Sequence, residues 1–249
     1  MTTLVATDLD RTLVHSARAA GTVPDGVVCL ERRGGVATAL LTPRTAQRLV
    51  ALDRRAWWVP ATTRTVAEYE RLALPRLGVA PRYAVCANGG VLLVDGVPDA
   101  AWSAEVARRL ARSAPLPEIA RRLGTSRDAD GCFLVARGAQ PDGLAAWCAE
   151  RGWRVDAHRD KVHVLPVALT KSAAVAEVRR RTGAARLLAA GDSPLDADLL
   201  AAADAGIQPV DGRLYAAGWR ADHVAVTSGR GLAAGEEIAA WLLRGLRPR

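Results

Sequence analysis

Two aspartates lie at the end of the first apolar segment of the chain. Leu4–Leu9 is predicted to form a buried strand, and Asp8, Asp10 and Thr12 lie at its end and just beyond it. A carboxylate can attack phosphorus and form a covalent aspartyl-phosphate. A second carboxylate can give a proton to the leaving group and later take one from water. In open α/β sheets ligands bind at this edge, so the pair indicates hydrolytic chemistry, with solvated strand-end acids as the alternative.

A second acidic group follows the predicted strand Leu187–Ala190, where Gly191 is followed by Asp192 and, four residues later, Asp196. Like charges 4 Å apart repel by about 4 kcal/mol at an effective dielectric constant near 20. Four carboxylates at one sheet edge therefore require a cation. A small number of oxygen ligands, completed by water and a substrate phosphate, favours Mg²⁺ over calcium or zinc.

Thr42 and Arg44 lie between the predicted strand Val36–Leu41 and the predicted helix Thr45–Asp53. A hydroxyl beside the amides of a helix N-terminus can hold a phosphate oxygen, so both residues are candidates for phosphate binding. The alternative is that Thr42 only caps the helix, with Pro43 at its first position.

Lys171 is the third candidate for anion binding. The chain has 34 basic residues, of which only Lys161 and Lys171 are lysine. Lys171 opens the predicted helix Ser172–Thr182, where its charge opposes the helix dipole. A bound anion would explain both observations, and a solvated surface lysine is the alternative.

The remaining candidate contacts are weaker and concern the substrate. Asn88 and Gly89 separate two short apolar runs, which predicts a hairpin turn first and a ligand contact second. Arg64 lies in a stretch, 61–64, that could border the site. Polar residues of a central segment, with a solvated hairpin tip as the alternative, are candidates for contact with the leaving group: Arg137, Lys161 and His163.

The elements that must position these residues alternate between strands and helices, which indicates an α/β fold with a doubly wound, Rossmann-like parallel sheet. Further strands are predicted at Trp57–Val59, Tyr83–Cys86, Val91–Val94, Ile207–Val210 and His223–Val226, and further helices at Val66–Leu74, Leu195–Ala203 and Leu232–Leu243.

The middle of the chain differs. Helices are predicted there at Ala101–Ser113, Leu116–Leu123 and Gly143–Glu150, and strands at Cys132–Ala136, Trp153–Ala157 and Lys161–Leu165. The last two strands pair as an antiparallel hairpin. We therefore expect a core of residues 1–97 and 167–249 that is interrupted by an α+β cap, 98–166.

Composition limits the class of protein. Half of the 249 residues are apolar and 24% are charged, with a net charge of +8, which is typical of a globular protein. The arginines fall in short helical clusters, so a nucleic-acid partner is not favoured. No segment is long enough to span a membrane and no secretory signal is found. The four cysteines are scattered and predict buried thiols, without zinc or disulfides. We expect a cytoplasmic monomer or homodimer.

In order and spacing, these segments resemble the haloacid dehalogenase superfamily of phosphatases. Asp8-Leu9-Asp10-Arg11-Thr12 matches its Asp-x-Asp-x-Thr signature, and Thr42, Lys171 and Gly191-Asp192 with Asp196 match its other motifs. The position of the insert is similar to the subgroup with a type C2B cap, which includes Cof-like sugar phosphatases.

The resemblance implies specific roles for these residues. Asp8 is implied as the nucleophile and Asp10 as the general acid and base, while Thr42 and Lys171 bind the phosphoryl group. Asp8, the Asp10 main-chain carbonyl and Asp192 are implied as Mg²⁺ ligands, supported by Asp196.

The chain departs from the pattern of many relatives at Arg11 and Pro43, where they have glycine, and at Leu195, where they often have asparagine. The function so predicted is hydrolysis of a small phosphorylated substrate, such as a sugar phosphate or nucleotide. A phosphotransferase or phosphomutase with the same phosphoaspartate is an alternative, and a non-catalytic polyanion-binding protein is another.

Overall fold

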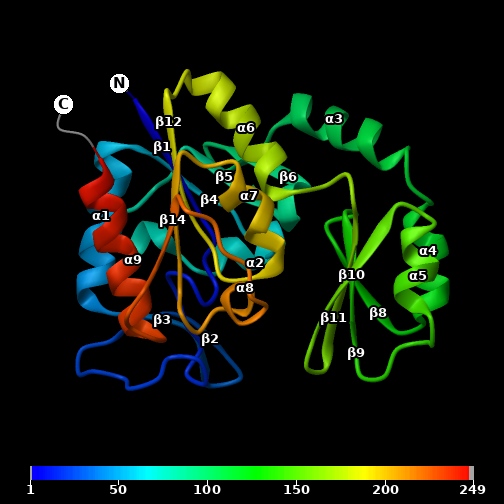
Figure 1. Cartoon of the computed structure of the whole chain (residues 1–249), viewed down its shortest axis with the longest axis horizontal. Helices are drawn as coiled ribbons and strands as arrows, with labels where there is room; N and C mark the ends of the chain where they lie inside the picture. The colour runs from blue at the N-terminus through cyan, green and yellow to red at the C-terminus, as the bar shows by residue number, and fades with distance from the viewer. Residues whose placement is uncertain (1, 247–249) are drawn as a thin grey trace.

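A five-stranded parallel sheet forms the centre of the molecule (Figure 1). The computed structural model describes residues 2–246. The strand order is β14-β13-β12-β1-β4, and every neighbouring pair is parallel. The strands are β1 (Thr3–Thr7), β4 (Trp57–Pro60), β12 (Arg186–Ala190), β13 (Ala205–Gln208) and β14 (Val224–Val226). The predicted α/β class with a parallel sheet is confirmed.

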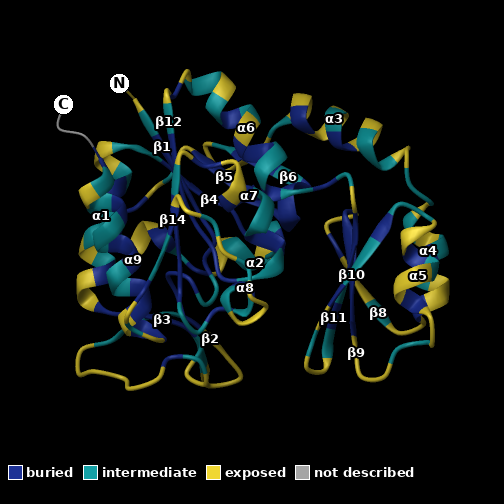
Figure 2. Ribbon diagram, viewed as in Figure 1, coloured by how far each residue is buried: buried dark blue, intermediate teal, exposed yellow. Residues whose placement is uncertain are grey.

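Helices cover both faces of this sheet, because successive residues of each strand point to opposite sides. Val5 of β1 packs in one apolar cluster with α1 and α9, whereas Leu4 and Ala6 pack in another with α6 and α7. Figure 2 shows the buried strands between these helices. The helices of the core are α1 (Pro43–Arg55), α2 (Val66–Glu70), α6 (Lys171–Thr182), α7 (Ala197–Ala201), α8 (Arg213–Ala216) and α9 (Leu232–Gly245).

Two antiparallel pieces lie beside the central sheet. The predicted strand Val36–Leu41 forms as β3, but it pairs with β2 (Val28–Arg33) in a hairpin of its own and does not join the parallel sheet. Gly34 and Gly35 form the turn of this hairpin with φ values of 54° and 79°, which favour glycine. The second piece consists of β5 (Tyr83–Cys86), β6 (Val91–Val94) and β7 (Val97–Pro98).

The segment after β7 forms a second α+β unit with a sheet of its own, which we call the cap. Its antiparallel sheet has the order β10-β11-β9-β8, and α4 and α5 cover the side that is turned away from the core (Figure 1). Its elements are α3 (Ala100–Leu110), α4 (Leu116–Leu123), β8 (Ser126–Ala129), β9 (Phe133–Arg137), α5 (Leu144–Ala149), β10 (Trp153–His158) and β11 (Lys161–Pro166). Strand β8 was not expected, because Ser126-Arg127-Asp128 carries no apolar pattern.

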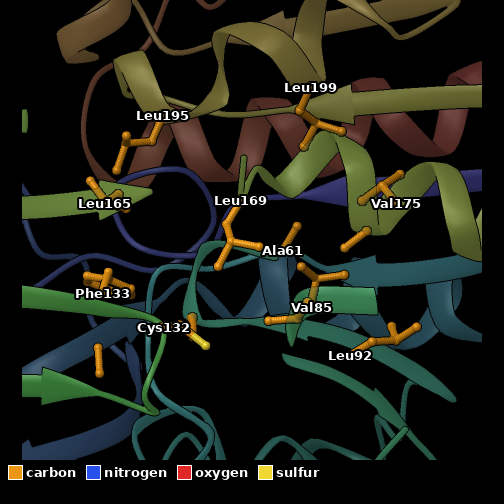
Figure 3. Packing of buried hydrophobic residues seen from close by; sticks show 14 of the residues in the cluster. Ala61, Val85, Leu92, Cys132, Phe133, Leu165, Leu169, Val175, Leu195 and Leu199 are labelled. Carbon is orange, nitrogen blue, oxygen red and sulfur yellow. The ribbon is translucent and has the colours of Figure 1, made fainter. Parts of the chain in front are cut away.

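Apolar side chains join the cap to the core. Cys132 and Phe133 of the cap belong to the same buried cluster as Val85 and Leu169 of the core (Figure 3). A Cβ atom on Gly90 would lie 2.3 Å from the Cys132 Sγ, so this contact requires a glycine. Packing therefore sets the position of the cap over the core.

Two helices of the core are shorter than predicted. The helix expected at Val66–Leu74 ends after Glu70, and Ala73 has a φ of 47°. The helix expected at Leu195–Ala203 divides into a 3₁₀ turn at Pro194–Asp196 and α7. Further 3₁₀ turns lie at Leu74–Leu77 and Ala87–Gly89. No helix within residues 2–246 is long and apolar enough to cross a membrane.

Candidate functional site

The carboxyl ends of β1 and β12 form the centre of the candidate site. Thr7 and Ala190 are paired in the parallel register of these strands, and the Asp8 amide donates to the Ala190 carbonyl at 2.9 Å. Asp8 directly follows β1, and Asp192 follows β12 after Gly191. The sheet therefore brings together two acidic groups that are separated by most of the sequence.

Three buried carboxylates and one ammonium group meet at this edge. One carboxylate oxygen each of Asp8, Asp192 and Asp196 lies within 4.8 Å of the others. The three residues are 5%, 3% and 0% exposed, and Lys171 is 1% exposed. The Lys171 Nζ lies 2.6 Å from an Oδ1 of both Asp8 and Asp196. The alternative of a solvated surface lysine is wrong.

When ionised, the three carboxylates of this centre carry more negative charge than Lys171 can neutralise. Burial raises the pKa of Asp8 to about 7; Lys171 opposes this effect, and Asp196 and Asp10 add to it. Burial, with Asp8 and Asp196 close by, also raises the pKa of Asp192 well above its usual value. The Asp192 Oδ2 is buried without a hydrogen-bond partner. A carboxylate oxygen in this situation fits a divalent cation, so the residues present suit Mg²⁺.

Asp196 holds the loop that presents Asp192. Its Oδ2 accepts hydrogen bonds from the Asp192 amide at 3.2 Å and from the Ser193 amide and hydroxyl at 3.0 and 2.9 Å. A Cβ atom on Gly191 would lie 2.3 Å from the Asp196 Cβ, so the close approach of this loop requires a glycine. Both Asp196 oxygens are engaged by the protein, which makes Asp196 a positioning residue.

Asp10 lies at the open side of the centre, where its side chain is 43% exposed. Its carboxylate accepts two hydrogen bonds from Arg64, from Nη2 at 2.8 Å and from Nε at 2.7 Å. Arg64 also donates to Glu31 at 2.9 Å. Arg64, which the sequence offered only as a weak candidate substrate contact at the border of the site, is thus the residue that orients Asp10.

Arg11, the residue between these aspartates and Thr12, has a φ of 66°. This conformation favours glycine, which many relatives have here. Its Nε lies 3.4 Å from the Asp192 Oδ2, and its Nη2 donates to the Asp211 carbonyl at 3.1 Å. Arg11 therefore places a partly exposed guanidinium group beside Asp192, the carboxylate whose buried oxygen best suits a metal ion.

The structure does not bring Thr42 and Arg44 into this site. Thr42 caps α1, accepting from the Thr45 amide at 3.0 Å, and its hydroxyl donates to Glu236 of α9 at 2.9 Å. Arg44 is 75% exposed and lies 3.3 Å from the same glutamate. Neither makes a hydrogen bond or ion pair with the four central residues, all of which are described. The physical reason is that β3 belongs to the separate hairpin, so its end is not at the edge of the central sheet.

Thr62 takes the place at the sheet edge that we had expected for Thr42. It follows β4, the neighbour of β1, and the Ala61 amide donates to the Thr7 carbonyl at 2.7 Å. Thr62 is 1% exposed, and its hydroxyl accepts from the Arg64 amide at 3.1 Å. We singled out only Arg64 in this stretch. The available signal was the apolar strand Trp57–Pro60, which ends just before Thr62 as β1 ends just before Asp8.

Asn88 and Gly89 connect Thr62 to Lys171. The Asn88 amide donates to the Thr62 carbonyl at 2.9 Å, and its side chain donates to the Leu169 carbonyl at 3.2 Å. A Cβ atom on Gly89 would lie 2.2 Å from the Thr170 carbonyl oxygen. The predicted hairpin turn between β5 and β6 is present, and it fixes the start of α6.

The cap residues lie on β9 and β11. Arg137 is exposed, and Lys161 and His163 are partly buried. The His163 Nδ1 lies 3.7 Å from the Asp156 Oδ2, and Asp156 forms a two-bond ion pair with Arg213 of the core at 2.7 and 3.0 Å. This pair connects the cap sheet with α8.

Solved structures resemble the whole chain. A sucrose-phosphatase from Synechocystis sp. PCC6803, in complex with sucrose and phosphate, is 18% identical with a TM-score of 0.69, over 98% of each chain. A haloacid dehalogenase-like hydrolase from Bacillus subtilis is 12% identical with a TM-score of 0.59, over 97% of this chain and 95% of that one. One from Bacteroides thetaiotaomicron is 14% identical with a TM-score of 0.56, over 98% and 99%. No family model and no curated protein matches the sequence. The chain therefore has the fold of the haloacid dehalogenase-like hydrolases.

Proposed function

We propose that the protein is a Mg²⁺-dependent phosphatase that hydrolyses a small phosphomonoester through an aspartyl-phosphate on Asp8. The observation that carries the proposal is the buried group of Asp8, Lys171, Asp192 and Asp196 at one edge of the parallel sheet. The fold supports it, since a phosphatase is among the similar structures. Phosphoryl transfer needs positioning and charge neutralisation most of all, and this group supplies both.

In the first step a carboxylate oxygen of Asp8 attacks phosphorus, and the bond between phosphorus and the leaving oxygen breaks. Asp10 donates a proton to that oxygen, and the two hydrogen bonds from Arg64 hold Asp10 in place. In the second step Asp10 takes a proton from water, which attacks the phosphorus of the aspartyl-phosphate. Inorganic phosphate leaves and Asp8 is restored.

The remaining residues neutralise and hold the phosphoryl group. Lys171 contacts the nucleophile directly and can donate to a phosphoryl oxygen. Thr62, with a buried hydroxyl at the end of β4, supplies the hydroxyl that we had assigned to Thr42. Mg²⁺ would be held by Asp8, Asp192 and the Asp10 main-chain carbonyl. When bound, it neutralises charge on the phosphoryl oxygens.

The test is phosphate release from a panel of sugar phosphates, nucleotides and small phosphomonoesters, with and without Mg²⁺. Asp8→Asn removes the nucleophile, so we expect turnover to disappear. Asp222→Asn, an exposed aspartate on the core, is the matched control and should keep full activity. Phosphate release that survives in Asp8→Asn would contradict the mechanism. No release by the wild type would exclude hydrolysis of these esters and direct attention to acceptor-dependent transfer.

A further inference from the structure

The side of the cap sheet that faces the core is unusually basic. Residues opposite one another in the register share a face, and Arg127, Val135, His163 and Asp156 form one such row across the four strands. Positions two residues away along each strand lie on the same face. Its basic side chains are Arg127, Arg137, Arg154, His158, Lys161 and His163. Asp156, the acidic residue of these strands on this face, is already paired with Arg213.

A cavity of about 670 Å³ lies between this face and the core. Its volume is that of a site for a small molecule, for which about 300–1,000 Å³ is typical. Its charged lining residues are Arg33 and Arg71 of the core, Arg127, Arg137 and Lys161 of the cap, and Glu68. Five basic residues and one acidic residue therefore line the cavity.

Existing ion pairs neutralise only part of this charge. Arg71 pairs with Glu31 at 2.9 Å, Arg127 pairs with Glu68 at 3.2 Å, and Arg137 pairs with Asp160 at 2.6 Å. Lys161 is partly buried, yet within residues 2–246 its ammonium group has no hydrogen bond or ion pair. Arg154, further along the same face, has two buried guanidinium nitrogens without a partner.

The cavity that Lys161 lines extends towards the reacting centre, because its lining residue Thr65 follows Arg64, whose guanidinium group donates to Asp10. Burial lowers the pKa of Lys161, whereas Glu68 and Asp10 are close enough to oppose that effect. Lys161 stands directly opposite Arg137 in the register of β9 and β11. A partly desolvated ammonium group without a partner is costly, and a bound anion would offset that cost.

We propose that this cavity receives the leaving group of the substrate, and that the leaving group carries a second anionic group which Lys161 and Arg137 bind. The substrate class is therefore a phosphomonoester with an additional carboxylate or phosphate. This inference rests on the proposed function, because it places the cavity beside the phosphoryl group that Asp8 attacks. A charge-assisted hydrogen bond predicts about a 10-fold to 100-fold preference for such esters.

The experiment compares kcat/KM for matched esters. Glycerol 3-phosphate against 3-phosphoglycerate tests a carboxylate, and glucose 6-phosphate against glucose 1,6-bisphosphate tests a phosphate. In Lys161→Gln the preference should fall towards one, and Lys161→Arg should restore it. Arg121→Gln, an exposed arginine on α4 at the outer side of the cap, should leave the preference unchanged. Equal kcat/KM within both pairs, or a preference that Lys161→Gln leaves intact, would overturn the inference.

Calorimetry on Asp8→Asn separates this inference from the proposed function, because that variant can bind these esters without turnover. If the wild type releases phosphate but shows no preference within either pair, the function stands and the inference fails. If no ester is hydrolysed, yet 3-phosphoglycerate or glucose 1,6-bisphosphate binds about tenfold more tightly than its partner ester, the inference stands and the function fails.

Discussion

The two lysines of this chain occupy opposite environments. Lys171, at the start of α6, is almost fully buried and contacts two carboxylates at 2.6 Å. Lys161, on β11 of the cap, is partly buried and, in the part of the chain that the structure describes, has no ion-pair partner. The first has its counter-charges built into the fold, and the second lines a cavity with its charge still available.

This difference indicates that the sheet edge carries out catalysis and that the cap face selects the substrate. At the sheet edge each group is held by neighbours that are also buried, so a change there disturbs folding and catalysis together. On the cap face most cations are arginines at the rim of a cavity, where solvent screens their interactions. A change there should alter the choice of substrate and leave the fold intact.

The largest effect is expected for Lys171→Met. It leaves Asp8 and Asp196 without their shared cation, which should lower the free energy of unfolding by about 3–5 kcal/mol near pH 8. The rate of phosphate release should fall by about 100-fold to 1,000-fold. Urea unfolding and steady-state kinetics measure the two effects. The matched control is Lys161→Met, which should change the unfolding free energy by no more than about 0.5 kcal/mol. Equal destabilisation by the two substitutions would contradict the comparison.

The next effect concerns pH and Mg²⁺. Burial raises the pKa of Asp8 from 3.8 to about 7, so the folded chain keeps a proton that the unfolded chain loses. In metal-free buffer the free energy of unfolding should therefore fall as the pH rises from about 4 to about 7. Mg²⁺ binds the ionised carboxylates, and at 100 times its Kd it should add about 2.7 kcal/mol.

Thermal unfolding at pH 5 and pH 8, with and without Mg²⁺, checks this prediction. The increase in Tm caused by Mg²⁺ should be larger at pH 8. Asp8→Asn serves as the control and should reduce both the pH dependence and the Mg²⁺ effect. An equal increase at the two pH values would show that ionised carboxylates do not hold the metal.

Substitution of Thr62 and of Thr42 tests which of the two threonines belongs to the catalytic site. Thr62→Val removes a hydroxyl at the edge of the central sheet, and we expect kcat/KM to fall about tenfold. Thr42→Val removes the cap of α1 and should lower the free energy of unfolding by about 1 kcal/mol, with activity retained. Kinetics and urea unfolding of both variants separate the two roles. Loss of activity in Thr42→Val alone would restore the prediction made from the sequence.

The two threonines also show how far the sequence could lead. Each hydroxyl follows an apolar strand, and only Thr42 directly precedes a clear helix, so local pattern favoured it. Which strand joins the central sheet depends on pairing between distant segments. β3 pairs with β2, and β2 is hard to recognise as a strand because it ends in the charged residues Glu31-Arg32-Arg33. Asp8 and Asp192 were easier to place, because both follow buried apolar strands that pair with each other in parallel.

The basic cap face was harder still to predict. Arg137, Lys161 and His163 were recognised as polar residues on predicted strands, but not as members of one surface. Their common face depends on the register of four strands, and β8 has almost no apolar residues from which to predict it. The cavity lies where the cap faces α2 and the end of β2, an arrangement of distant segments that no local pattern encodes.

The smallest effect is expected at the ion pair that connects the two regions. Arg213 lies 2.7 Å from Asp156 of the cap, and the adjacent Leu214 amide donates to the Asp192 carbonyl at 2.8 Å. The pair thus links the cap sheet to the loop of the buried centre. The substitution Asp156→Asn leaves one acceptor oxygen for Arg213 and removes the charge, so it should weaken this contact by about 1 kcal/mol. Because the contact holds the cap beside the proposed substrate cavity, we expect about a fivefold increase in KM.

Steady-state kinetics with the best ester measure this change, and Asp142→Asn, an exposed aspartate elsewhere in the cap, is the control. Because Asp156 contacts neither Asp8 nor Lys171, kcat should change less than KM. A loss in kcat that exceeds the change in KM would mean that the link to Asp192 affects the buried centre itself. In that case chemistry and selection would be coupled through Arg213, and the separation drawn from the two lysines would fail.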